Sequence, residues 1–124
     1  MNNRFLVFFI IILSTQLFFA QVKYETFESE KLGASRELKI QLPRGYTNNQ
    51  DKNYPIFIVL DGDYLFEAVA GNVDYYSYWE DMPEAIVVGI NQLDSRFDDC
   101  MYSEQNSLPV ETGAAFFEFI GMEL

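Results

Sequence analysis

The feature that most constrains this chain is a run of five apolar residues, 56–60, that stops at Asp61-Gly62-Asp63. Because the run does not alternate with polar residues, it predicts a strand over residues 54–60 that is covered on both faces, as in a parallel sheet. Gly62 permits a sharp turn just after the strand. In open α/β sheets ligands bind at this end, where free backbone N–H groups can stabilise a developing negative charge. The alternative is an ordinary turn that uses Asp and Gly for its backbone geometry alone.

A second apolar run, AIVVGI at residues 85–90, predicts another buried strand. The 24 residues between the two runs suit a crossover, so we expect the strands to be parallel. Within the crossover, residues 64–70 predict a short helix that ends at Gly71-Asn72. The aromatic-rich residues 73–79 then form either a packed loop or a wall that contacts a ligand.

Before these strands, residues 22–29 and 35–42 predict a hairpin. The second of its strands alternates apolar and polar side chains, with Leu38, Ile40 and Leu42 on one face, which indicates a single covered face.

After the second apolar run, residues 91–108 are polar and without a period. They predict a solvated loop in which Arg96 pairs with a nearby aspartate, and the spacing of the acids matches no EF-hand calcium loop. Residues 110–124 predict an amphipathic helix. Its expected apolar face carries Gly113, Phe116, Phe117, Ile120 and Leu124.

The charge is strongly negative and unevenly placed. The net charge is −11, and residues 53–124 contain fourteen acids against one base, Arg96. This disfavours nucleic acid and anionic membranes as partners, since their phosphates would be repelled. Histidine is absent from the 124 residues, which removes His-based general-base catalysis and most zinc sites from them. The single cysteine, Cys100, cannot form an internal disulfide and is predicted to be a buried thiol.

Residues 1–20 have the layout of a secretory signal peptide. Arg4 precedes 16 uncharged, mostly apolar residues that end at Ala20. That stretch is shorter than the ~20 residues that span a bilayer. Cleavage after Ala20 would leave residues 21–124 as an exported domain, periplasmic or extracellular, with no stable membrane anchor. An uncleaved anchor is the alternative, because Phe18 is larger than the small residue usual at that position.

Three segments together resemble the N-terminal part of one esterase branch of the α/β-hydrolase superfamily, which includes enterochelin esterases, S-formylglutathione hydrolase, feruloyl esterases and mycolyltransferases. The segments are RELKIQLPRGY, YPIFIVLDGDYLF and AIVVGINQLDSRFDD, and the resemblance extends over residues 24–124. It implies an α/β fold comprising strands one to four of a hydrolase sheet with flanking helices. It also implies an exported serine esterase that acts on a small-molecule carboxylic ester without a cofactor.

The resemblance carries over to a few residues only. It implies that the backbone N–H of Asp63 is half of an oxyanion hole, that Gly62 makes the approach to it possible, and that Asp61 and Tyr64 contact substrate. The G-x-S-x-G elbow is absent, which implies a chain truncated before the elbow, without the catalytic serine, acid and histidine. Two other interpretations stay open: a secreted non-catalytic binding module that uses residues 73–79, and the inactive product of a split reading frame.

Overall fold

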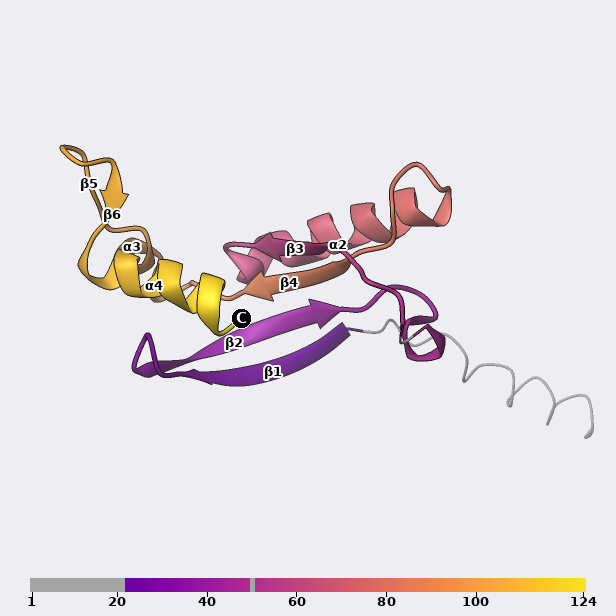
Figure 1. The fold of residues 1–124 in the computed structure, drawn as a ribbon, viewed down its shortest axis with the longest axis horizontal. Coiled ribbons are helices and arrows are strands. Elements are labelled where there is room, and N and C mark those ends of the chain that lie inside the picture. The colour runs from indigo at the N-terminus through magenta and orange to yellow at the C-terminus, as the bar shows by residue number, and fades with distance from the viewer. Residues whose placement is uncertain (1–21, 50) are drawn as a thin grey trace, which may run out of the picture.

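The computed structural model describes residues 22–49 and 51–124, so the predicted signal peptide lies outside the described part of the chain. Its strands and helices are shown in Figure 1. In order they are β1 (Val22–Ser29), β2 (Ala34–Gln41), the 3₁₀ turn η2 (Tyr46–Asn48), β3 (Ile56–Val59), α2 (Gly62–Tyr78), β4 (Ile86–Ile90), α3 (Arg96–Asp99), β5 (Tyr102–Ser103), β6 (Leu108–Pro109) and α4 (Glu111–Met122). None of the helices in these ranges is long and apolar enough to cross a membrane.

Within the described residues, the first four strands form one mixed sheet in the order β1-β2-β4-β3. The predicted hairpin is confirmed: β1 and β2 are antiparallel, with Val22 opposite Gln41. β4 pairs antiparallel with β2 and parallel with β3, where Ile58 lies opposite Val88. The crossover length therefore predicted the parallel pair correctly. Parallel pairing places the carboxyl ends of β3 and β4 side by side, next to α3 (Figure 1).

The prediction that the first apolar strand is covered on both faces is wrong for the described part of the chain. β3 lies at the edge of the sheet, where Ile56 is 59% exposed and Phe57 and Ile58 are each 41% exposed. Only Val59 is buried in this strand. An apolar, uncharged edge with unpaired backbone groups is a ready template for another strand.

The crossover holds one long helix, which corrects the prediction of a short helix followed by a packed loop. α2 continues through Gly71 to Tyr78, although Gly in a helix interior costs about 1 kcal/mol relative to Ala. Packing outweighs that cost, because Phe66, Ala70 and Val73 recur at helical spacing on one face of α2. This face forms a buried cluster with Val59, Ala85 and Val87 of the sheet.

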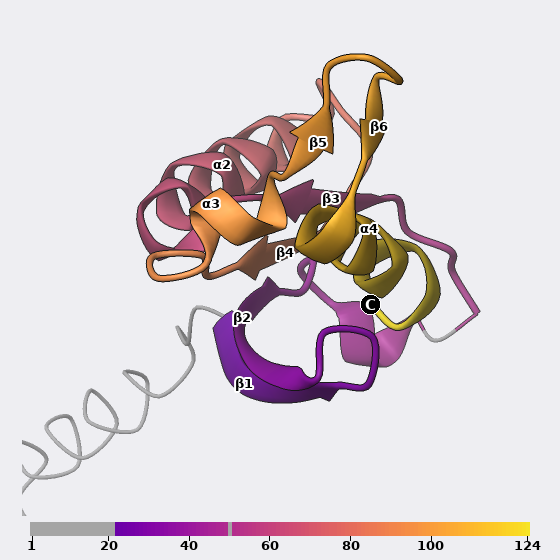
Figure 2. The same ribbon diagram turned by 90° about the vertical axis from the view of Figure 1, so that its left-hand side faces the viewer.

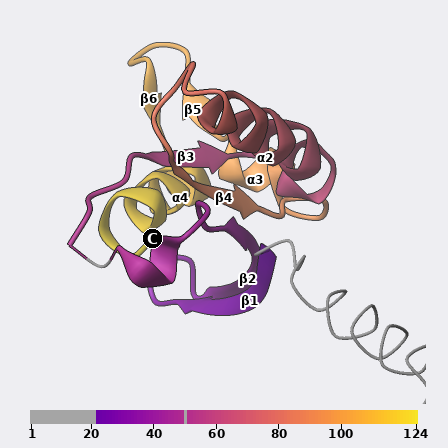
Figure 3. The same ribbon diagram turned by 90° about the vertical axis from the view of Figure 1, so that its right-hand side faces the viewer.

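A second helix, α4, lies across the sheet from α2, and the two helices flank β4 in Figures 2 and 3. The predicted helix is confirmed, but its predicted apolar face is partly wrong. Phe116 and Phe119 are buried against Leu38 and Ile90, whereas Phe117 is 68% exposed. Gly113 is required because a Cβ there would collide with the carbonyl oxygen of Met101.

Both faces of β2 are covered, which corrects the expectation of a single covered face. Leu38 packs toward α4, while the side chain of Lys39 is buried against α2. The Lys39 ammonium contacts the Glu67 carboxylate at 2.7 Å, and the amide nitrogen of Gln41 donates to the carbonyl oxygen of Ala70 at 2.9 Å. Lys39 and Gln41 thus bond to α2 rather than to solvent, whereas Glu37 on the same face of the strand is exposed.

The polar segment 91–108 is more ordered than predicted. It contains α3 and the short antiparallel hairpin β5–β6. Arg96 does pair with an aspartate: its Nε lies 3.2 Å from Oδ1 of Asp61, which comes from the turn after β3 and not from the segment itself. Cys100 is exposed, so the predicted buried thiol is wrong.

The uneven charge along the sequence reflects pairing across the fold. Five ion pairs each join a base before residue 53 to an acid after it. They are Lys31–Glu118, Arg36–Asp99, Lys39–Glu67, Arg44–Asp74 and Lys52–Glu84. Bases from the first part of the chain therefore pair with acids from the acidic second part within one domain.

Candidate functional site

The turn that follows β3 has an unusual backbone conformation. Asp61, which precedes the first residue of α2, has φ 52° and ψ 43°, in the left-handed region. Among residues with a side chain, Asp and Asn adopt that conformation most readily, because they are short and can bond locally. The turn thereby reverses the chain immediately after the strand and directs the start of α2 toward β4.

Gly62 is pressed against the backbone of β4. A Cβ on Gly62 would lie 2.8 Å from the carbonyl carbon of Gly89 and from the amide nitrogen of Ile90. Both are main-chain atoms of a central strand and cannot move aside without distorting the sheet. Gly89 in turn admits Phe66, since a Cβ there would lie 2.7 Å from the Phe66 ring. Two glycines thus set how closely the turn and the strand approach.

The first N–H groups of α2 point out of the helix without an intrahelical acceptor, as at any helix start. The N–H groups of Tyr64 and Leu65 both bond to the carbonyl oxygen of Asp61, at 3.2 and 3.0 Å. None of the hydrogen bonds found within residues 22–49 and 51–124 uses the N–H of Gly62 or of Asp63. Both lie at the positive end of a 17-residue helix, and Asp63, which lines a cavity, is the one of the two that an anion can approach.

The side chain of Asp63 fastens this turn to the end of β4. Its Oδ1 accepts the backbone N–H of Gln92 at 2.7 Å and that of Leu93 at 3.3 Å. Asp63 therefore contributes structure through its carboxylate, and its backbone N–H is the group free for chemistry.

The other predicted site residues lie around the same turn. The Asp61 carboxylate meets Arg96, and the side chain of Tyr64 is 69% exposed. A polar cavity of about 350 Å³ lies beside Asp63. It is lined by Ser35, Arg36, Glu37, Asn91, Leu93 and Ser95, among others.

The larger cavity, about 610 Å³, lies at the opposite end of the sheet. Its lining includes Tyr78, the only ring of the aromatic segment 73–79 to contribute there, and the Arg44–Asp74 ion pair. The structure thus keeps this cavity and the turn after β3 apart. We assign the candidate site to the turn, because its backbone donors are free and the opposite cavity offers paired charges.

Sequence reasoning missed a buried polar group behind the turn. Gln92, Asp99 and Arg36 form a connected set of hydrogen bonds that ends on the Asp61 backbone. One signal could have indicated it: a glutamine two residues beyond a buried strand, at the edge where the neighbouring parallel strand also ends.

The groups that complete ester hydrolysis are not among these residues. The sequence has no histidine, and Ser77 donates its hydroxyl hydrogen bond to the carbonyl oxygen of Pro83, away from the turn. In the part of the chain that the structure describes, no group of three or more metal-ligating side chains could hold an ion.

Comparison with known proteins identifies the family. The family described as “Putative esterase” matches residues 29–123, most of the chain. No curated protein matches. The chain belongs to this esterase family, as its sequence resemblance indicated.

Solved structures agree with this assignment. An uncharacterised protein from Capnocytophaga ochracea is 35% identical, with a TM-score of 0.72 over 83% of this chain and 28% of its own. An IroE-like serine hydrolase from Shewanella oneidensis is 24% identical, with a TM-score of 0.66 over 82% of this chain and 36% of its own. The enterobactin esterase FES from Shigella flexneri is 23% identical, with a TM-score of 0.59 over 83% of this chain and 24% of its own.

The two less similar structures establish the fold and nothing finer. The predicted fold class is confirmed: the mixed sheet with its helices corresponds to the N-terminal part of the α/β-hydrolase fold of these enzymes. This chain spans only about a quarter to a third of the length of the three structures.

Proposed function

We propose that this chain is the N-terminal portion of an exported serine-type esterase that hydrolyses a small-molecule carboxylic ester. The observation that carries the proposal is the N–H of Asp63, which has no acceptor among the described residues and which Gly62 holds close to the end of β4, at the carboxyl edge of parallel strands. Membership of the esterase family and the serine-hydrolase fold of its relatives support it.

In this mechanism the turn stabilises charge. A serine Oγ attacks the ester carbonyl carbon and passes its proton to a histidine, and the carbonyl electron pair moves onto oxygen. That oxyanion accepts hydrogen bonds from the Asp63 N–H and from the N–H after the serine. The intermediate then collapses, the alcohol leaves with the proton, and water releases the acid in a second round.

The serine and the histidine would come from outside these 124 residues, because no histidine and no G-x-S-x-G elbow occurs in them. Asp61 and Tyr64 would contact the substrate from the near side of the turn. We expect the isolated 124-residue chain to show no turnover of p-nitrophenyl acetate above background, and a co-purifying activity that Ser77→Ala or Ser103→Ala abolishes would contradict this.

The experiment isolates the native protein with an antibody against the β5–β6 hairpin and treats it with a fluorophosphonate that labels activated serines. We expect labelling, ester hydrolysis and a mass greater than that of the 124 residues. Native protein without labelling or hydrolysis would refute the esterase.

The oxyanion role is tested in that active protein by Asp63→Pro. Proline is tolerated in the first turn of a helix and removes the N–H. Asp63→Ala is the matched control, since it also loses the carboxylate but keeps the N–H. We expect the kcat of the proline variant to fall about 10²–10³-fold below that of the alanine variant. Equal kcat values would assign the oxyanion hole elsewhere.

Export is tested by expressing the chain with its own N-terminus in a Gram-negative host. We expect it to leave the cytoplasm and to lose about 20 residues. Soluble cytoplasmic protein that retains Met1 in its mass spectrum would contradict export.

A secreted binding module is the second candidate, and one observation favours it. Tyr75, Tyr76, Tyr78 and Trp79 are each about half exposed or more, all at the C-terminal end of α2. Two results together would favour this module over the enzyme. The native protein would show no esterase activity, and it would bind a ligand that the Trp79→Ala variant no longer binds.

A further inference from the structure

Gln92 is a glutamine that the structure buries completely, two residues after the end of β4. Its side chain is 1% exposed. Its amide oxygen accepts the backbone N–H of Asp61 at 3.0 Å, while its own backbone N–H donates to Oδ1 of Asp63 at 2.7 Å. One residue therefore bonds to both sides of Gly62.

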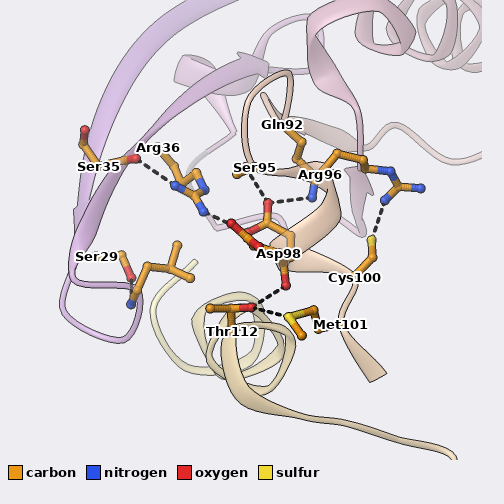
Figure 4. Close-up of polar contacts among 12 residues, drawn as sticks. Ser29, Ser35, Arg36, Gln92, Ser95, Arg96, Asp98, Cys100, Met101 and Thr112 are labelled. Atoms are coloured by element: carbon orange, nitrogen blue, oxygen red, sulfur yellow. Dashed lines mark hydrogen bonds and ion pairs between the residues drawn. The ribbon is translucent and has the colours of Figure 1, made fainter. Parts of the chain in front are cut away.

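The other end of the Gln92 amide is anchored too. Its Nε2 donates to Oδ2 of Asp99 at 2.8 Å. The same carboxylate accepts Arg36 Nη2 at 2.8 Å and Ser95 Oγ at 2.7 Å. Figure 4 shows Arg36, Gln92 and Ser95 close together, with their hydrogen bonds as dashed lines.

The chemistry of this arrangement fits the amide of a glutamine. The Asp61 N–H requires an acceptor and the Asp99 carboxylate requires a donor, and a glutamine amide presents one of each. A glutamate would set two carboxylates against each other, and an asparagine is one methylene too short to reach both partners. Because both ends of the buried Gln92 amide are bonded, the side chain is held in one orientation.

The turn has need of such support. The left-handed backbone of Asp61 is costly for a residue with a side chain and persists only where its surroundings hold it. Oxyanion stabilisation depends on donors that are already in place when charge develops. A small rotation of the turn would misdirect the N–H of Asp63.

We propose that Gln92 is a positioning residue: it holds the Asp61–Asp63 turn so that the N–H of Asp63 faces the oxyanion. This assignment rests on the proposed esterase function. Gln92 itself touches no substrate, and Asp99 fixes its orientation from behind.

The test compares Gln92→Met with Gln41→Met in the native protein. Gln41 is the matched control, because its amide also bonds to a backbone group, donating to the carbonyl oxygen of Ala70 on α2, but it lies away from the turn. Two readouts are taken: steady-state kinetics on p-nitrophenyl acetate, and amide hydrogen exchange at Asp61, Gly62 and Asp63.

For Gln92→Met we expect kcat to fall at least about tenfold while KM changes less than about twofold, since transition-state stabilisation is what is lost. We also expect exchange at the Asp61 N–H to quicken about tenfold or more relative to Gln41→Met. Ser95→Ala, which removes one donor to Asp99, should shift both readouts in the same direction by less, and it serves if Gln92→Met does not fold.

Unchanged exchange at Asp61 in Gln92→Met, or equal kinetic losses in the two methionine variants, would overturn the assignment. A protein without any esterase activity would refute the proposed function alone. In that case the exchange measurement still decides whether Gln92 holds the turn.

Discussion

The two ends of the sheet are built in opposite ways. At the carboxyl ends of β3 and β4, the Arg36–Asp99 pair is buried, with side-chain exposures of 15% and 2%, and it connects through Gln92 to the backbone of a turn. At the other end, the Arg44–Asp74 pair is exposed, at 62% and 39%, and lines the larger cavity. The larger cavity therefore does not mark the candidate site. The candidate site lies at the end with the buried ion pair, because that is where the backbone donor of the turn has to be positioned.

Removing the buried acid should have the largest effect. Asp99→Ala leaves the Arg36 guanidinium buried without its carboxylate and Gln92 without its acceptor. We expect a loss of about 3–5 kcal/mol in the free energy of unfolding, as when one member of a buried pair is removed. Urea denaturation measures it, with Asp74→Ala at the exposed end as the control. Equal losses in the two variants would show that the buried and the exposed ion pair contribute equally to the free energy of unfolding.

Gly62→Ala should come next. The added Cβ would meet main-chain atoms of Gly89 and Ile90 at 2.8 Å, so either α2 or β4 has to shift. Overpacking of this kind costs about 1–3 kcal/mol. A thermal melt of the variant tests it, and an unchanged Tm would mean that the turn is not fixed against β4.

Gly71→Ala, in the same helix, should act in the opposite direction. No atom lies within 4 Å of a Cβ at this position, and Ala is favoured over Gly in a helix interior by about 0.5–1 kcal/mol. We therefore expect a higher Tm than wild type. A lower Tm would indicate that the middle of α2 needs its glycine for a reason that packing does not reveal.

The exposed ion pair should give the smallest effect, and one that depends on pH. The hydrogen bond from Arg44 lowers the pKa of Asp74 below its usual 3.8. A carboxyl with a depressed pKa adds stability above 3.8, and this is lost as the pH falls through the lower folded-state value. Arg44→Gln should thus cost less than about 1 kcal/mol near neutral pH, and the difference from wild type should shrink below pH 3.8. A difference that stays constant from neutral to acid pH would contradict the pairing.

The parts of the fold that could be predicted are those where the local pattern and the tertiary structure agree. The two uninterrupted apolar runs become the parallel pair, because burial and β propensity favour the same state in both. The length of α2 could not be predicted, since Gly71-Asn72 is a local stop signal that packing of Phe66 and Val73 overrides. Phe117 and Phe119 are equally apolar, and only the position of the sheet decides which of them is buried.

The candidate site divides in the same way. Gly62 could be predicted because an Asp-Gly sequence directly after an apolar run indicates a turn. Gln92 was missed, although its place two residues beyond a buried strand is a signal. Its partners Asp61 and Asp99 are set by how the strands and α3 meet, and a glutamine in a polar segment is typical of solvated loops. The single covered face predicted for residues 35–42 would leave Lys39 exposed. It is buried instead, because its partner Glu67 lies on a helix 28 residues later.

The position of β4 between β2 and β3 has a consequence for the order in which the chain can fold. The β1–β2 hairpin involves neighbours in sequence and can close as soon as residue 41 has been synthesised. β3 has to wait, because in the described fold it bonds only to β4, whose residues follow about 30 positions later along the chain. During that interval its apolar side chains lack a partner strand, and this is when a holding chaperone would have most to protect.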